Sequence, residues 1–229
     1  MKKTTQKLII FIGIIMFTFS AGSVWAKIWE GDYTIVTSDD ISALSGYTVV
    51  SGDLKIVSSY NLKDLRGLEN IANVGGNLEI LNNTSLTSLR GLENIASIGG
   101  SFWIESNANL KSLSALSNIT SVAGGVIIAR NDTLTDLSGL ENITSIGAFL
   151  VIDDNKSLTN LNAFSNVTSM GETLYIINNL SLTSLTGLEK ITLSGENLII
   201  SGNGSLTGRT SCIIKKTMNL KAKYKLSCL

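Results

Sequence analysis

The chain repeats itself with a period of 24 residues over most of its length. Equivalent apolar residues stand, with no insertion between them, at Leu54, Leu78, Phe102, Val126, Leu150, Leu174 and Leu198, and the repeat continues to about Ser201. A fixed period of about 20 to 50 residues is typical of solenoids, in which each coil buries its apolar face only by stacking on its neighbours. The repeat therefore predicts a solenoid for most of the 229 residues.

One coil, residues 76–99, contains two kinds of apolar spacing. Leu78 and Ile80 alternate with Glu79 and Leu81, which is the period of two expected for a strand with one face turned inward. Apolar residues then recur at every third position, at Leu86, Leu89, Leu92, Ile95 and Ile98. This second spacing fits neither a long strand nor a helix of about 3.6 residues per turn. It predicts short extended segments joined by corners, and so an all-β solenoid of parallel strands.

Glycine and asparagine mark the corners between these segments. Paired glycines at 75–76 and 99–100 are expected to form one corner, where glycine adopts positive φ at low cost. Asparagines recur in two columns, one at Asn83, Asn107, Asn131, Asn155, Asn179 and Asn203, with Ser59 in the first coil, and one at Asn70, Asn94, Asn118, Asn142 and Asn166. A side-chain amide satisfies backbone groups that a turn leaves free. We therefore interpret both columns as structural.

Two motifs carry a family resemblance. Residues 85–95 read SLTSLRGLENI, and residues 181–189 read SLTSLTGLE. They resemble the receptor L-domain family, which includes the ligand-binding L domains of insulin and epidermal growth factor receptors and many bacterial secreted proteins. The resemblance covers residues 31–206, and it implies a right-handed, single-stranded parallel β-helix with a capping helix near Asp39 to Leu44. Ligand-contacting residues vary within the family, so the resemblance assigns none here.

The sequence predicts four parts along the chain. Residues 1–26 read as a signal peptide, with early lysines, an apolar run from Leu8 to Phe19 and a cleavage-like Val24-Trp25-Ala26, although an uncleaved membrane anchor is the alternative. Residues 27–53 form an N-terminal cap and first partial coil, and residues 54–206 form the repeats. Residues 207–229 form a basic C-terminal cap. The predicted location is secreted, periplasmic or at the cell surface.

The C-terminal part contains both cysteines, Cys212 and Cys228. In an exported protein such a pair favours a disulfide over a metal site, and two free thiols are the alternative. The same part contains six cations and no acid, at Arg209, Lys215, Lys216, Lys221, Lys223 and Lys225. This charge suits either a solvated cap or a contact with an anionic polymer, and with Tyr224 as its one aromatic residue no nucleic acid is expected.

One outward column of the predicted strands is unusually apolar. The first two coils have charged residues in this column, Lys55 and Glu79. The next five coils have large apolar residues there, at Trp103, Ile127, Val151, Tyr175 and Ile199. An extended apolar patch often marks a partner site, so these five residues are the predicted contact face for a protein or carbohydrate. The alternatives are an ordinary half-buried sheet, or a face covered by a chain terminus or a second copy.

Catalysis is not expected. The chain contains no histidine, which excludes Ser-His-Asp and Cys-His arrangements and imidazole metal ligands. Glu105 and Asp153 share a column two coils apart, so a glycan-cleaving enzyme is a weak alternative. No cofactor or metal site is predicted; Asp132 and Asp136 alone give weak support for calcium. The leading hypothesis is an exported, non-catalytic binding or scaffolding module, and the second is a structural or self-associating envelope protein.

Overall fold

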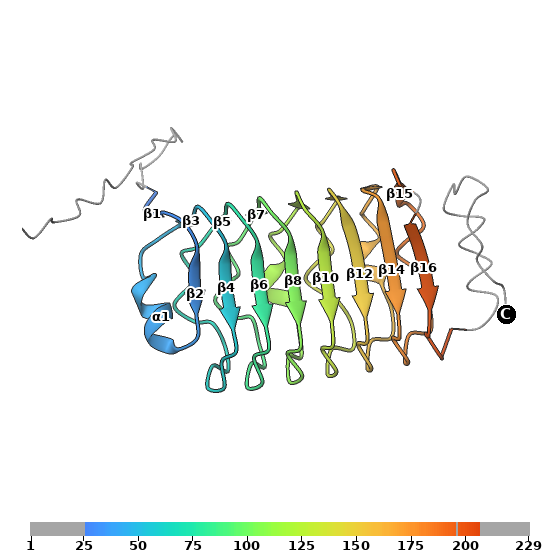
Figure 1. Ribbon diagram of the computed structural model, residues 1–229, viewed down its shortest axis with the longest axis horizontal. Helices are drawn as coiled ribbons and strands as arrows, with labels where there is room; N and C mark the ends of the chain where they lie inside the picture. The colour runs from blue at the N-terminus through green and yellow to red at the C-terminus, as the bar shows by residue number, and fades with distance from the viewer. Residues whose placement is uncertain (1–25, 196, 207–229) are drawn as a thin grey trace, which may run out of the picture.

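The computed structural model describes residues 26–195 and 197–206 (Figure 1). In this range the chain forms a parallel β-solenoid whose strands lie side by side along the long axis of the molecule. The predicted fold class is confirmed. The predicted signal peptide up to residue 25, the pair Cys212 and Cys228, and the basic tail lie outside the described residues.

Two sheets of eight parallel strands form the walls of the solenoid. The broad sheet contains β2 (Tyr33–Ile35), β4 (Leu54–Val57), β6 (Leu78–Leu81), β8 (Phe102–Glu105), β10 (Val126–Ala129), β12 (Phe149–Asp153), β14 (Thr173–Ile177) and β16 (Asn197–Ser201). The narrow sheet contains β1 (Ile28–Trp29), β3 (Val49–Val50), β5 (Asn73–Val74), β7 (Ser97–Ile98), β9 (Ser121–Val122), β11 (Ser145–Ile146), β13 (Ser169–Met170) and β15 (Thr192–Leu193).

The pairing register follows the sequence repeat across the broad sheet. Leu54 pairs with Leu78, and every later pair up to Leu174 with Leu198 keeps the same step of 24 residues. The last coil of the narrow sheet departs from this step, because Ser169 pairs with Thr192. That step is one residue short, and the longer connection from β15 to β16 restores the register of the broad sheet.

A single apolar core fills the space between the sheets. The inward residues of β4 to β14, such as Phe102 and Ile128, are completely buried. The residues at every third position after the strands are buried as well, at Leu86, Leu89, Leu92, Ile95 and Ile98 in one coil. The predicted corners therefore turn each of these side chains inward, and each coil buries its apolar residues against the next.

The paired glycines serve a different purpose from the one expected. Gly75, Gly76, Gly99 and Gly100 do not have positive φ angles. Their role is close packing between coils, because a Cβ atom built on Gly75 would lie 2.2 Å from the carbonyl oxygen of Ser51. The positive φ angles fall at other corners, directly after the broad-sheet strands, at Ser58, Asn82, Ser106, Arg130, Asp154 and Asn178.

A further corner exists in two forms. In four coils a glycine with positive φ donates its N–H to the glutamate two residues later, as Gly91 does to Glu93 at 2.7 Å; the others are Gly67, Gly139 and Gly187. In the two coils with alanine at this position, Ala115 and Ala163, a short 3-10 helix forms instead. These are η1 (Ser114–Leu116) and η2 (Asn162–Phe164). The local sequence thus decides the form of the corner.

The first asparagine column forms a buried hydrogen-bond ladder. The Oδ1 atom of Asn131 accepts the backbone N–H of Asn107 at 3.1 Å, and its Nδ2 atom donates to the carbonyl oxygen of Ile104 at 3.1 Å. The same contacts recur along the column, whose members are Asn83, Asn107, Asn131, Asn155, Asn179 and Asn203. Because these amides are buried and occupied by the backbone, their predicted structural role is confirmed.

The second asparagine column is exposed but also connects coils. The Nδ2 atom of Asn118 donates to the carbonyl oxygen of Glu93 at 2.6 Å, and Asn142 and Asn166 make the equivalent contact one coil further each. These amides hold the corner residues of successive coils together. The structural interpretation applies to this column too.

The capping helix α1 (Ser38–Ala43) closes the N-terminal end of the core. It begins after Thr37, and the Oδ2 atom of Asp40 accepts the backbone N–H groups of Val36 and Thr37 at 3.0 and 2.8 Å. These hydrogen bonds hold the pKa of Asp40 below its ordinary value. Ile41 and Leu44 are buried against the first coil.

Candidate functional site

The structure brings the five predicted contact residues into one row. Trp103, Ile127, Val151, Tyr175 and Ile199 are register partners on the consecutive strands β8 to β16. Neighbouring members are one strand spacing apart, about 4.8 Å. Four of them are half-buried, and Ile199 is 44% exposed. We call this row the aromatic face. It lies on the outer surface of the broad sheet, with all five side chains pointing away from the core.

Phe149 also belongs to this surface, although the sequence analysis did not select it. It begins β12 and lies half-buried two residues before Val151. A Cβ atom built on Gly125, the equivalent residue of the preceding coil, would come within 2.2 Å of the Phe149 ring. The ring therefore covers the space that the glycine leaves open. The sequence indicates this packing by a glycine at position 125 and a large residue, Phe149, at the equivalent position of the next coil.

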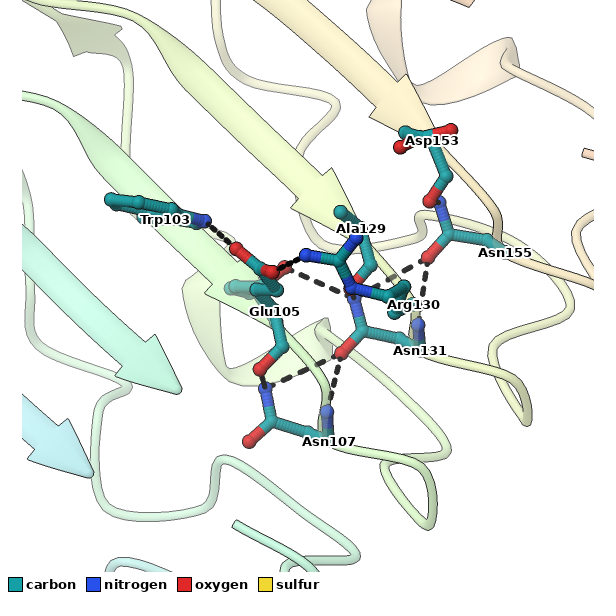
Figure 2. Close-up of polar contacts among 9 residues, drawn as sticks. Trp103, Glu105, Asn107, Ala129, Arg130, Asn131, Asp153 and Asn155 are labelled. Carbon is teal, nitrogen blue, oxygen red and sulfur yellow. Dashed lines mark hydrogen bonds and ion pairs between the residues drawn. The ribbon is translucent and has the colours of Figure 1, made fainter. Parts of the chain in front are cut away.

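A charged network fixes the tryptophan of the aromatic face (Figure 2). The indole Nε1 of Trp103 donates to Oε2 of Glu105 at 2.7 Å, and the guanidinium of Arg130 forms an ion pair with Oε1 of the same carboxylate. Glu105 lies on the same strand as Trp103, whereas Arg130 reaches back from the next coil. The indole N–H is consequently satisfied within the molecule, and the tryptophan presents its apolar ring to solvent.

Arg130 occupies a backbone position that is unusual for its residue type. Its φ angle is 53°, in the left-handed region, where the other described non-glycine residues of this corner are serine, asparagine or aspartate. Short polar side chains tolerate this conformation better than long ones do. From this position the guanidinium of Arg130 reaches the carboxylate of Glu105 in the preceding coil.

The two acids of the neighbouring column do not form a catalytic pair. Glu105 and Asp153 are both register partners of Ala129, so they lie about 9.6 Å apart along the sheet. Trp103 and Arg130 already occupy both oxygens of Glu105. Asp154, the next acid along the chain, lies outside the strand, because β12 ends at Asp153 and Asp154 has a φ angle of 49°.

Three hollows of the described surface can be compared with the aromatic face, and two of them lie away from it. One of about 590 Å³ lies between α1 and the first coil, next to Ser42, Lys63 and Arg66. Another of about 400 Å³ follows the narrow sheet along Ser121, Ser145 and Ser169. A smaller one of about 190 Å³ adjoins Phe149 and Thr173. The aromatic face is accordingly suited to a broad contact with another surface more than to enclosing a small molecule.

Neither a metal site nor a membrane-spanning helix is found in the described part of the chain. Residues 26–195 and 197–206 contain no group of three or more acidic, cysteine or histidine side chains placed to hold a metal ion. The same residues include no helix with the length and hydrophobicity needed to span a bilayer.

Comparison with protein families shows to which family this chain belongs. The model of the receptor L domain matches residues 46–136 and residues 97–221. The chain belongs to the receptor L-domain family. The two matches overlap, as expected for coils so alike that one family pattern fits in more than one position. No curated protein matches the sequence.

Membership defines the general class of the protein. Receptor L domains are ligand-binding domains without enzymatic activity, they bind protein ligands, and they are an extracellular domain type. The resemblance inferred from residues 85–95 and 181–189 is therefore confirmed. The five predicted contact residues and the cysteine pair stay predictions.

Proposed function

We propose that this L domain is an exported, non-catalytic module that binds a protein partner through the aromatic face. The observation that carries the proposal is the continuous row of Trp103, Ile127, Val151, Tyr175 and Ile199 on the outer side of the broad sheet, where four of the residues are half-buried and Ile199 is exposed. Contiguous apolar patches of this kind are rare on isolated soluble proteins and often mark interaction sites. Export rests on the signal-like residues 1–26.

The chemistry of the face favours a protein over a carbohydrate. Sugar-binding sites combine aromatic rings with free polar groups that pair with hydroxyls. Here the Trp103 indole N–H and both oxygens of Glu105 are already paired within the molecule. The face therefore offers mainly rings and aliphatic side chains, which pack well against the apolar core of a protein interface.

The test compares two sets of variants of residues 27–229. Trp103→Ala/Tyr175→Ala removes both rings of the face, and Tyr60→Ala removes an aromatic ring that is 71% exposed but lies at a corner outside it. Each form is immobilised and offered solubilised envelope proteins and, separately, envelope glycans. Bound proteins are identified, and their affinity is measured with the purified partner.

We expect the native form and Tyr60→Ala to bind one protein equally. The double variant should bind it at least about 30-fold more weakly, corresponding to about 2 kcal/mol for the loss of an interface anchor. Circular dichroism should show the same β content in all forms. Equal binding by the double variant would contradict the assignment and direct attention to the basic tail as a contact for an anionic polymer. Capture of glycans alone would contradict the protein partner.

Self-association is the competing function. If the aromatic face joined two copies of this chain, sedimentation equilibrium would give a dimer for the native form and a monomer for Trp103→Ala/Tyr175→Ala. A monomer for both forms would exclude this structural role.

A further inference from the structure

Two positions next to the broad-sheet strands form a contact between successive coils. The first position, directly before the strand, holds a short polar residue that caps a corner, and Oδ1 of Asn77 accepts the backbone N–H of Ser101 at 2.7 Å. The second position holds a glycine of the next coil, and a Cβ atom built on Gly100 would lie 2.3 Å from Oδ1 of Asn77. The same arrangement recurs at Asp53 with Gly76 and at Ser101 with Gly124.

The pair of residues at these positions changes in the coils of β12 and β14, where it is Phe149 and Glu172. Phe149 has no side-chain oxygen that could cap the corner. The second position holds a small residue in the four preceding coils, at Gly76, Gly100, Gly124 and Ala148. The coil after Glu172 also has glutamate there, at Glu196, which lies outside the described residues. In a chain that otherwise follows its repeat, departures from the structural pattern are expected at functional sites.

The two exceptional residues line one hollow of about 190 Å³, together with Gly147, Ala148 and Thr173. Pockets that enclose drug-sized ligands measure about 300–1,000 Å³, so this hollow has the scale of a single side chain.

The hollow adjoins the aromatic face. Phe149 pairs with Thr173 across β12 and β14, and two residues later Val151 pairs with Tyr175. Side chains two residues apart on a strand point to the same side of the sheet, so Phe149 and Thr173 share the outer surface with Val151 and Tyr175. A partner seated on the aromatic face would therefore lie over the hollow.

The chemistry of the hollow is that of a cation site. Glu172 is exposed, and within the described residues its carboxylate forms no ion pair and accepts no hydrogen bond. The described residues that line the hollow include no cation. A carboxylate attracts a guanidinium or ammonium group by charge, and the face of an aromatic ring attracts the same groups through its quadrupole.

We propose that this hollow receives an arginine side chain of the protein that binds the aromatic face. The inference rests on the proposed function and adds to it the chemistry of one partner residue. Arginine suits both walls, because its planar guanidinium stacks on a ring and donates two parallel hydrogen bonds to a carboxylate. Arginine is also enriched among the anchors that dominate the affinity of protein interfaces.

A structural role accounts for only one of the two exceptional residues. The ring of Phe149 covers the space above Gly125, so packing contributes to its presence. Packing does not account for Glu172, whose exposed carboxylate contacts no partner among the described residues.

The first test uses a probe that needs no partner protein. Isotope-labelled residues 27–229 are titrated with N-acetyl-arginine methylamide and, separately, with the uncharged N-acetyl-citrulline methylamide, and the amide resonances of Gly147, Phe149 and Thr173 are followed. We expect saturable shifts with the arginine probe at a Kd of about 1–10 mM, and binding of the citrulline probe at least about 10-fold weaker.

Variants locate the site of the probe. Glu172→Gln should weaken binding of the arginine probe at least about 5-fold, and Phe149→Leu, which keeps an apolar side chain and removes the ring, should weaken it as well. Glu79→Gln is the matched control, because it makes the same change of charge on the outer side of β6 and should leave binding unchanged.

The second test uses the protein captured on the native form. Its affinity should fall at least about 10-fold with Glu172→Gln and stay the same with Glu79→Gln. A partner whose affinity depends on Glu172 but not on Trp103 and Tyr175 would overturn the proposed function and leave the arginine site in place.

Three results would overturn the inference itself. Equal binding of the arginine and citrulline probes would show that the hollow does not select a cation. Binding of the arginine probe that survives Glu172→Gln would place the cation elsewhere. A partner that loses affinity with Trp103→Ala/Tyr175→Ala but not with Glu172→Gln would leave the proposed function intact and show that the complex does not use the hollow.

Discussion

At the scale of single residues, the buried asparagines replace one partner of a backbone hydrogen bond with a side chain. Asn131 is completely buried, and its side-chain amide bonds the backbone of its own coil at Ala129 and of the preceding coil at Ile104 and Asn107. A buried backbone N–H that loses its acceptor costs about 1–3 kcal/mol. Each asparagine of the ladder therefore prevents a loss of this size at its own corner.

We predict that Asn131→Ala lowers the free energy of unfolding by about 3 kcal/mol, because it leaves the N–H of Asn107 without its acceptor and removes the amide that donates to the carbonyl oxygen of Ile104. Asn118→Ala, in the exposed second column, should cost less than about 1 kcal/mol, since water replaces the lost contact. Urea unfolding of both variants measures the difference. Equal losses would show that the buried ladder is no more important than the surface column.

Gly91 gives a second residue-level prediction. Its φ angle is 113°, and an added Cβ atom would lie 2.0 Å from the carbonyl oxygen of Leu65. We expect Gly91→Ala to destabilise the protein by at least about 2 kcal/mol, through backbone strain and this clash.

Ala115 provides the matched control for Gly91, because it occupies the equivalent position one coil later. Ala115→Gly should cost only about 0.5–1 kcal/mol, the usual effect of added chain entropy. Thermal unfolding followed by circular dichroism compares the two. A Gly91→Ala variant as stable as the native protein would contradict the account of this corner.

Some residue roles could be predicted from the sequence, and others could not. The asparagine columns were predictable because a polar residue that recurs at a corner has few other uses. The roles of Gly75 and Gly99 were not, because glycine serves both positive φ and close packing, and only the distance to the neighbouring coil distinguishes them. The pairing of Trp103 with Glu105 and Arg130 depends on side-chain torsions that spacing does not determine.

At the scale of elements, the cap of α1 depends on one ionised carboxylate. The lowered pKa of Asp40 means that the folded state binds its proton less readily than the unfolded chain does. The stabilisation is therefore present above the ordinary aspartate pKa, about 3.9, and is lost as the pH falls through the lower folded value.

We predict that the amides of α1 lose their protection from hydrogen exchange as the pH falls below about 4. Asp40→Asn should produce the same loss at neutral pH and cost about 1 kcal/mol. Asp39→Asn is the control, because it removes an equally placed acid of the first helical turn that makes no capping hydrogen bond. An Asp40→Asn helix as protected as the native one would exclude the capping role.

Most elements followed from the repeat, and the exceptions have local causes. The strands of the broad sheet were predictable from the alternation at Leu78 to Leu81, which recurs in each coil. The 3-10 helices η1 and η2 were not predicted, although alanine in place of glycine at Ala115 and Ala163 marks both of them. The 23-residue step at Thr192 is marked in the sequence, because Leu193 follows Ile191 at a spacing of two residues, whereas Met170 follows Val167 at a spacing of three.

At the scale of the whole molecule, the strict register makes a coil a removable unit. We predict that deletion of residues 131–154, which joins Arg130 to Asn155, leaves a folded solenoid with one coil fewer. Its circular dichroism should keep the native shape, and its unfolding should stay cooperative at a lower melting temperature. An unfolded product would show that the coils are not independent units.

The same deletion tests the aromatic face as a spatial pattern. It removes Val151 and brings Trp103 one strand spacing, about 4.8 Å, closer to Tyr175. A partner that contacts both rings should bind the shortened form at least about 10-fold more weakly, even though both rings are present. Unchanged affinity would mean that the partner uses one ring only.

The constant register across the broad sheet also has a consequence for how such a gene changes with time. Neighbouring coils have similar amino-acid sequences and one fixed length, so an in-phase recombination between their coding regions would add or delete a whole coil. The product keeps the ladder contacts of Asn107 and Asn155 in phase, because both asparagines occupy the same place in their coils. Descendants of one ancestor can therefore differ in coil number, and so in the length of partner they span, without passing through an unfolded intermediate.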